Sequence, residues 1–278
     1  MIPLKHAPRP TSKAKRIPER NPRMTFIAGF KCAGGLVICA DQLEDDGIKI
    51  RYRNKITRRM IGDKGNIVWA CSGLSSTIEK FTDKLSRLLG SEFDGPKAEV
   101  HIEACLKYIN EQYDYQNRVE AIIGMCGQEM VTPAEGEPYP HWQTSLYKAS
   151  STDHCVSPQP DYCFAGMDTT LAEFIVRNTF TPFMGIEEAI RLGVFVTAAM
   201  KQYASGVGGD TNVYACKLGD SNFTTYGPDD ITAIESSLPI DELNWAMTTH
   251  WWSKHPVGDD RFTQHLRESI ASKKKMPR

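Results

Sequence analysis

The stretch "MTFIAGFKCAGGLVICADQ", Met24 to Gln42, constrains the fold of this chain more than any other segment. Two short apolar runs flank a Cys-Ala-Gly-Gly turn, a pattern typical of a β-hairpin. Residues equidistant from the turn face each other in an antiparallel pair, so a turn centred on Ala33 and Gly34 places Thr25 opposite Asp41 or Gln42. Cross-strand neighbours lie roughly 5 Å apart at Cβ. The hairpin therefore predicts that a hydroxyl and a carboxylate share one site.

A third polar group, Lys55, follows in "YRNKI", where Ile56 indicates a return to sheet structure. Hydroxyl, carboxylate and ammonium together can form a nucleophilic centre. A threonine hydroxyl needs a base, and no histidine lies near Thr25 in the sequence. The α-amino group of the threonine itself, with an ordinary pKa of about 7.7 to 8.0, is one such base. That chemistry requires Thr25 to be the first residue of the mature chain.

In this scheme Lys55 lowers the pKa of the amine and the hydroxyl, and Asp41 keeps the lysine charged and oriented. The alternative is structural: Thr25 is an ordinary strand residue, and Asp41 and Lys55 form a stabilising ion pair. The spacing alone leaves both interpretations open.

Apolar periodicity along the rest of the chain predicts blocks of strands alternating with pairs of helices. The expected strands are 25–31, 36–41, 66–73, 120–126, 144–150, 161–166, 212–219 and 223–227. The expected helices are 78–88, 100–109, 169–180 and 185–204, with a further helical region at 241–252. This order favours an α+β sandwich with antiparallel sheets over regular βαβ units.

Composition excludes several classes of protein. A net charge of -1 over 278 residues argues against a general nucleic-acid binder. No apolar run is long enough to span a membrane, and the first twenty residues contain no secretory signal, so we expect a cytoplasmic protein. The eight cysteines are scattered singly without a Cys-x-x-Cys pair, which favours buried thiols over disulfides or a zinc site. We expect neither a metal nor a cofactor.

Both ends of the chain differ from its middle. Residues 1–23 contain five prolines and seven Lys or Arg against the single Glu19, too little apolar surface to offset the entropy of ordering. We therefore expect residues 1–24 to be a basic, Pro-rich arm or leader that is disordered or removed. A domain over 25–250 follows, and 251–278 form a C-terminal extension with a basic tail.

The hairpin, followed by "NKI" and "VWACSGL", resembles the opening of the proteasome-type subunits, a family that includes the 20S proteasome subunits and HslV-like bacterial relatives. The resemblance covers roughly 25–227. It implies an Ntn-hydrolase fold, a four-layer αββα sandwich of two antiparallel sheets flanked by helices. It also places Thr25 on the nucleophile, Asp41 on the acidic position, Lys55 on the lysine and Gly73 on the backbone N–H that holds the oxyanion.

The implied function is a threonine-type N-terminal-nucleophile peptidase that works inside a self-compartmentalised ring. The implied partners are peptide or unfolded-protein substrates, other copies of the same chain in a ring, and an ATPase. An amidase or acyltransferase that uses the same nucleophile is a further possibility, because one fold hosts many reactions.

Two departures bear on proton handling around the threonine. In "AGMD", Met167 replaces a serine that supports the amino group in active members of the family. In "YASGVGGDTN" the position of the auxiliary polar residue is ambiguous between Ser205 and Asp210.

A different class of function also fits the sequence. Inert α-type subunits share the style of "GFKCAGGLVICAD" and "CSGL", so a catalytically inert, structural or gating subunit is the alternative. The arm lacks the Tyr-Asp-Arg-like and Gln-Val-Glu-Tyr-Ala-like signatures of those subunits, which favours the enzyme.

Overall fold

The computed structural model describes residues 25–45, 50–61, 65–89, 95–113, 118–131, 133, 136–153, 155–167, 169–204, 206–220 and 222–237. These residues form five helices and three sheets, all antiparallel. The α+β class expected from the sequence is confirmed. The expectation of two sheets is wrong for the described residues, because a short third sheet of β3 (Leu43–Asp45) and β4 (Ile50–Tyr52) follows the first hairpin.

The first large sheet has the strand order β10-β1-β2-β11-β12. Its strands are β1 (Phe26–Cys32), β2 (Gly35–Asp41), β10 (Tyr162–Gly166), β11 (Thr211–Lys217) and β12 (Thr224–Tyr226). The second large sheet has the order β5-β6-β7-β8-β9. Its strands are β5 (Ile56–Ile61), β6 (Gly65–Gly73), β7 (Val119–Val131), β8 (Tyr139–Ser150) and β9 (Cys155–Gln159).

The hairpin turn lies where the sequence predicts it, at Ala33 and Gly34. The register pairs Cys32 with Gly35 and Ile27 with Ala40, which brings Thr25 level with the end of β2. Gly34 is required by close packing, because a Cβ there would lie 2.3 Å from the backbone nitrogen of Ile186. The turn is thus anchored against the start of α4 (Ile186–Tyr203).

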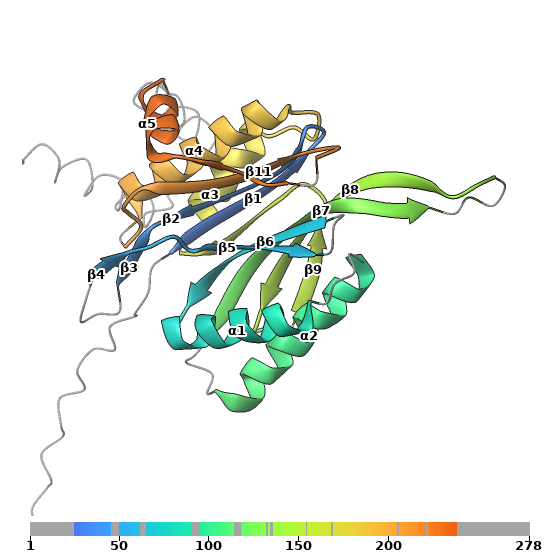
Figure 1. Cartoon of the computed structure of the whole chain (residues 1–278). Helices are drawn as coiled ribbons and strands as arrows, with labels where there is room; N and C mark the ends of the chain where they lie inside the picture. The colour runs from blue at the N-terminus through green and yellow to red at the C-terminus, as the bar shows by residue number, and fades with distance from the viewer. Residues whose placement is uncertain are drawn as a thin grey trace, which may run out of the picture.

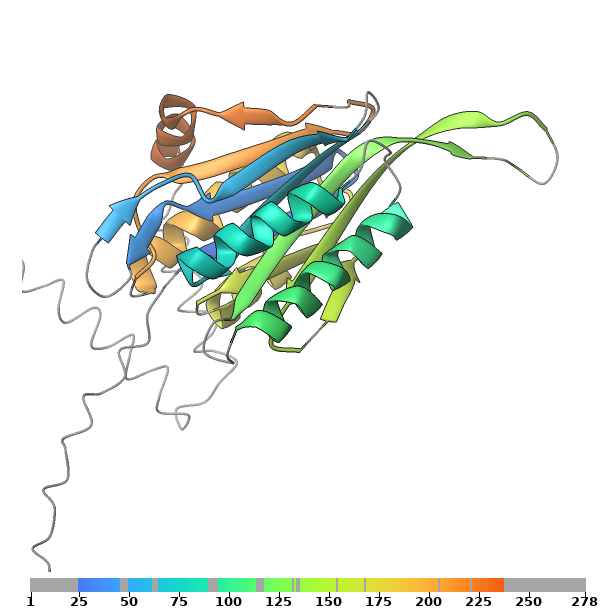
Figure 2. The same cartoon turned by 60° about the horizontal axis from the view of Figure 1, so that its bottom comes forward.

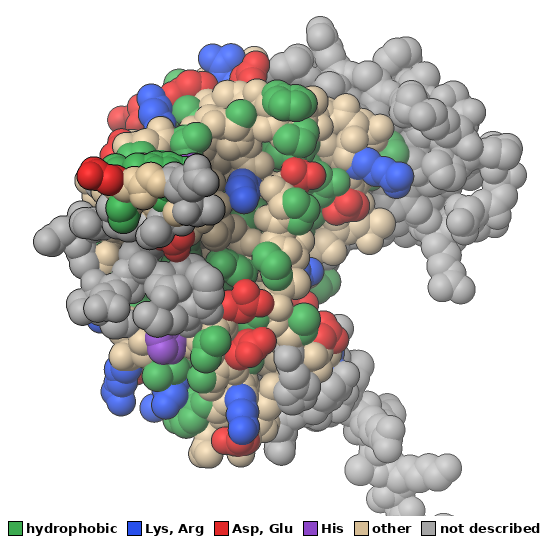
Figure 3. Space-filling view, turned by 90° about the vertical axis from the view of Figure 1, so that its right-hand side faces the viewer, with side chains coloured by type: hydrophobic (Ala, Val, Ile, Leu, Met, Phe, Trp, Pro, Cys, Tyr) green, Lys and Arg blue, Asp and Glu red, His purple; other side chains and the backbone are tan. Residues whose placement is uncertain are grey.

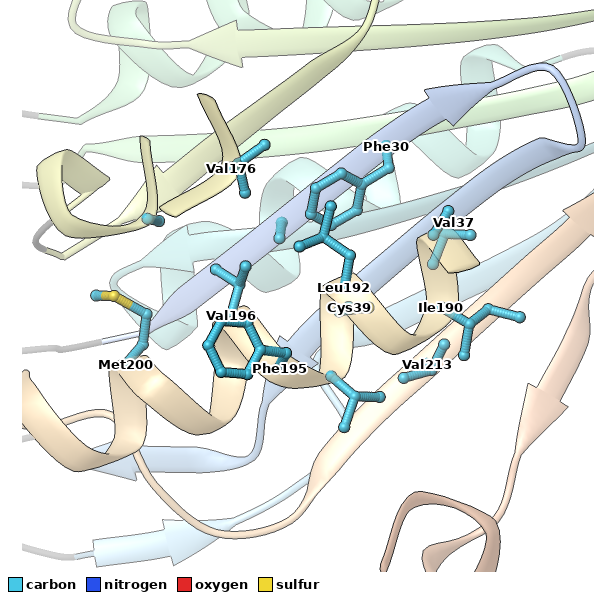
Figure 4. Close-up of a cluster of buried hydrophobic side chains, with 14 of the residues drawn as sticks. Phe30, Val37, Cys39, Val176, Ile190, Leu192, Phe195, Val196, Met200 and Val213 are labelled. Carbon is cyan, nitrogen blue, oxygen red and sulfur yellow. The ribbon is translucent and has the colours of Figure 1, made fainter. Parts of the chain in front are cut away.

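The helices cover the outer faces of the two large sheets (Figure 1). On the first sheet lie α3 (Thr169–Thr179) and α4, which pack with Phe30, Val37 and Cys39 in the cluster of Figure 4. On the second sheet lie α1 (Ser75–Leu88) and α2 (Gly95–Gln112), with Phe81 and Trp69 among the buried side chains. The last described helix, α5 (Pro228–Ser237), lies against α4.

The inner faces of the two large sheets are also apolar. Ile27, Ile38, Val68 and Ile122 belong to one buried cluster drawn from both sheets. Strands β1 and β2 are therefore buried on both sides, which is why they appear in the sequence as nearly continuous apolar runs.

Strands β7 and β8 continue well past their neighbours as a two-stranded ribbon (Figures 1 and 2). Their mutual pairing runs out to Val131 and Tyr139, whereas β6 pairs with β7 only as far as Gly127, and β9 pairs with β8 only as far as Leu146. On the face shown in Figure 3, acidic and basic side chains are interspersed, and neither sign forms a continuous field. No helix among the described residues is long and apolar enough to cross a membrane.

Candidate active site

Lys55 lies at the centre of the candidate site, just before β5. Its Nζ lies 2.9 Å from Thr25 Oγ1 and 2.8 Å from Asp41 Oδ1, and it also donates to the carbonyl of Leu43. Side-chain exposure is 6% for Lys55 and 0% for Asp41. Burial lowers the pKa of Lys55, while the charge of Asp41 acts in the opposite direction and favours the ammonium. Thr25, Asp41 and Lys55, which the sequence predicted to lie close together, are therefore in contact.

The carboxylate of Asp41 organises the backbone around it. Its Oδ1 accepts from the N–H of Phe26 at 2.9 Å as well as from Lys55, and its Oδ2 accepts from the N–H groups of Leu43 at 3.2 Å and Gly208 at 3.1 Å. Four donors thus satisfy the hydrogen-bonding capacity of a fully buried carboxylate. Asp41 holds together the start of β1, the end of β2 and the loop before β11.

The backbone of Thr25 is fixed by the end of β10. Its carbonyl accepts from the N–H of Met167 at 2.9 Å. Gly166 has a φ of 96°, and a Cβ there would lie 1.8 Å from the Thr25 oxygen. Only glycine permits this approach. Met167 is the residue that stands where active proteasome-type subunits have a serine, and it contacts Thr25 through its backbone N–H.

Glu120 connects this segment to the second sheet. Its Oε2 accepts from the N–H of Gly166 at 2.9 Å, and in the β6–β7 ladder Glu120 is paired with Ser72, next to Gly73. Gly73 itself has a φ of 142°, and a Cβ there would lie 2.2 Å from the carbonyl oxygen of Arg118. One carboxylate therefore ties the segment that holds Thr25 to the strand that ends at Gly73.

A cavity of about 210 Å³ opens beside these residues. Thr25, Lys55 and Gly73 all line it, so the hydroxyl, the cation and the candidate oxyanion donor share one space. This is smaller than the ~300–1,000 Å³ of clefts that bury a drug-sized ligand, and it suits a single side chain. Within the described residues, no group of three His, Cys, Asp or Glu side chains is placed to hold a metal ion.

Of the two candidate auxiliary residues, Ser205 and Asp210, the structure describes only Asp210. Ser205 lies outside the described residues. Asp210 is exposed in the loop before β11 and does not line the cavity. From the same loop it is Gly208 that reaches the site, through its backbone N–H to Asp41. The sequence analysis did not identify this glycine as a site residue.

Comparison with known proteins relates this fold to solved structures. No protein-family model matches the sequence, and comparison with curated protein sequences finds no match. A structure titled "Anbu (Gly-1) mutant", from Hyphomicrobium sp. strain MC1, aligns with a TM-score of 0.64 at 13% identity, over 81% of this chain and 98% of its own.

Two further structures agree with it. Anbu, described as an ancestral beta-subunit, from Yersinia bercovieri aligns with a TM-score of 0.62 at 11% identity, over 84% of this chain and 99% of its own. A structure titled "Helical Assembly of the Anbu Complex", from Pseudomonas aeruginosa, aligns with a TM-score of 0.59 at 15% identity, over 84% of this chain and 98% of its own. At these identities the comparison shows a shared fold.

These structures correct the family expected from the sequence. The 20S proteasome and HslV-like subunits were expected, whereas the similar structures are Anbu proteins, a distinct proteasome-like family. The resemblance rested on short segments in β1, β2 and the end of β6. These segments build the two large sheets, so they indicate the fold and do not distinguish the families that share it.

Proposed function

We propose that this protein is an N-terminal-nucleophile hydrolase that cleaves peptide bonds with Thr25. The observation that carries the proposal is the 2.9 Å contact between Lys55 Nζ and Thr25 Oγ1, with Asp41 behind the lysine. A cation in contact with a hydroxyl favours its deprotonation and stabilises the alkoxide that attacks. We extend the proposal to a four-layer αββα arrangement of the Ntn-hydrolase type for the domain at 25–250.

In the proposed reaction Thr25 Oγ attacks the substrate carbonyl carbon while the α-amine of Thr25 takes the hydroxyl proton. The backbone N–H of Gly73 stabilises the oxyanion. The C–N bond then breaks, and the amine passes its proton to the leaving nitrogen. Water, deprotonated by the same amine, attacks the resulting ester, which releases the acid and restores the hydroxyl.

This chemistry requires a free amine at Thr25, so we propose that residues 1–24 are absent from the active enzyme. Two routes lead there. The Met24–Thr25 bond is cleaved by the protein itself, or translation starts at Met24 and the methionine is removed because threonine is small. In both cases the basic arm is lost.

Intact mass and N-terminal sequencing of the purified full chain, combined with a peptide-hydrolysis assay, test the proposal. Active protein should begin at Thr25. The Thr25→Ser variant should still hydrolyse peptides and form the acyl ester between residue 25 and the substrate. The Thr25→Ala variant should lose both without unfolding. Active protein with residues 1–24 still attached would contradict the mechanism, because an amide nitrogen is not a base. An intact arm with no hydrolysis, and no hydrolysis by protein whose translation starts at Met24, would support a structural subunit instead.

We also propose that the protein acts as a homo-oligomer on peptide or unfolded-protein substrates, with an ATPase as partner. One similar structure is titled as a helical assembly, and repeated heterologous contacts form rings when the rotation closes and helices when it does not. Light scattering at micromolar concentrations should therefore give a mass of several chains, and a monomer throughout would argue against assembly.

A further inference from the structure

We infer that the cavity beside Thr25 selects a substrate with a lysine or arginine side chain on the residue whose carbonyl is attacked. This inference rests on the proposed function, because it concerns the same site. The cavity is lined by Thr25 itself, so the side chain next to the attacked carbonyl is the one that enters it.

The charges lining the cavity favour a cation. Among the described residues, three carboxylates line it, from Glu44, Glu79 and Asp83, against two cations, Arg53 and Lys55. The charge of Lys55 is already matched by Asp41 at 2.8 Å. One lining cation therefore faces three lining carboxylates, and the cavity has an excess of negative charge.

Arg53 is not free to attract an acidic substrate. Its Nε lies 2.7 Å from Glu44 Oε2, and its Nη1 lies 4.0 Å from Glu79 Oε1. Glu44 is also the acceptor of the Ser75 hydroxyl, and its side chain is only 13% exposed. An acidic side chain would have to compete with a nearly buried carboxylate for the same guanidinium, at an energetic cost.

Helix α1 gives the cavity a wall suited to a long cationic side chain. Ile78 and Thr82 lie one turn apart and line the cavity, and Glu79 and Asp83 follow each of them with exposed carboxylates. Lysine and arginine place their methylene stem along apolar surface and keep the charge at the wet end. The stem would lie along Ile78 and Cys71, with the charge at Glu79 and Asp83.

The test uses fluorogenic peptides that differ only in the residue before the scissile bond, measured with purified protein whose N-terminus has been confirmed as Thr25. Arginine and lysine substrates should be cleaved about tenfold faster than leucine, and glutamate slowest. Glu79→Gln and Asp83→Asn should each lower the arginine-to-leucine ratio of kcat/KM about two- to fivefold. Glu111→Gln, which neutralises an exposed carboxylate on α2, is the matched control and should leave the ratio unaltered.

A second measurement separates this inference from the proposed function. Reduced-bond peptides carrying arginine or norleucine, titrated calorimetrically into the same protein, report the side-chain preference without hydrolysis. Tighter binding of arginine with no turnover would support the cavity assignment and count against the peptidase. Acylation of Thr25 with faster leucine or glutamate cleavage would overturn the cavity assignment and leave the peptidase standing. Equal binding of both peptides would also overturn the assignment.

Discussion

At the scale of single residues, Lys55 has two roles that a mutation separates only in part. Its ammonium contacts Thr25 Oγ1, and it also neutralises Asp41, whose side chain is fully buried. Lys55→Met should therefore lower hydrolysis at least about 100-fold and also destabilise the fold, by up to about 3 kcal/mol, because it leaves a buried charge without its counter-ion. The three backbone donors to Asp41 limit that loss.

Activity and urea unfolding should be measured on the same preparations of this variant. Adding Asp41→Asn should cost less stability than the sum of the two single changes, because the pair is removed together. Unchanged turnover in Lys55→Met would mean that the lysine is purely structural.

Glu120 is expected to position Thr25 without reacting itself. Glu120→Gln retains an acceptor for the N–H of Gly166, whereas Glu120→Ala removes it and loosens the segment that holds the Thr25 carbonyl. The alanine variant should lose about tenfold in kcat with KM nearly unchanged, and the glutamine variant should recover most of this loss. Equal loss in both, with a shifted pH–rate profile, would instead show that the carboxylate takes part in proton transfer.

The residues of the site differ in how far the sequence predicts them. Thr25 and Asp41 follow from hairpin geometry, because the spacing from a two-residue turn fixes which residues are level. Glu120 does not, because it lies within an apolar strand and gains its role only when β10 crosses above it. Gly208 contributes a backbone N–H, which leaves no chemical signature in the sequence.

At the scale of elements, the packing of α4 on β2 depends on a glycine inside the helix. Alanine normally stabilises a helix interior by about 1 kcal/mol relative to glycine. A Cβ at Gly193, however, would lie 2.4 Å from Cys39 Sγ and 3.4 Å from the ring of Phe30. Gly193→Ala should therefore destabilise the protein by about 1–3 kcal/mol in denaturant unfolding.

The matched control adds Cys39→Ala, which removes the sulfur that the new methyl group meets. The double variant should be more stable than Gly193→Ala alone, an outcome that simple additivity forbids. If Gly193→Ala stabilises the protein, α4 does not pack as closely on β2 as the structure indicates.

Element prediction succeeded where packing gives a periodic pattern and failed where it does not. Strands β1, β2 and β6 and helix α4 are long and strongly apolar. Helix α5 was not expected, because Ile231 is its only buried residue. Strand β9, "CVSPQ", was not expected either, because it contains a proline and lies at a sheet edge. The expected helix at 241–252 lies outside the described residues.

At the scale of the whole molecule, the buried cysteines should make the free energy of unfolding fall as the pH becomes alkaline. Burial raises the pKa of five thiols above the ordinary value, to about 12 for two of them. The five are Cys32, Cys39, Cys71, Cys105 and Cys163. In the unfolded chain the same thiols ionise near pH 8.5, so above that pH the folded state binds more protons than the unfolded state.

Ionisation of these thiols should therefore have no effect on the free energy of unfolding below about pH 8. Above that pH the free energy of unfolding should fall, by up to about 1.4 kcal/mol per thiol for each pH unit. Lys55, whose pKa burial lowers, acts in the opposite direction, but it is one group against five. Urea unfolding at pH 7.5, 8.5 and 9.5 under reducing conditions measures the slope. Cys163→Ala should reduce it, and Cys155→Ser, at an exposed thiol, should not. A flat profile would mean that the core thiols ionise in the folded protein, which the dry interior between the sheets and helices opposes.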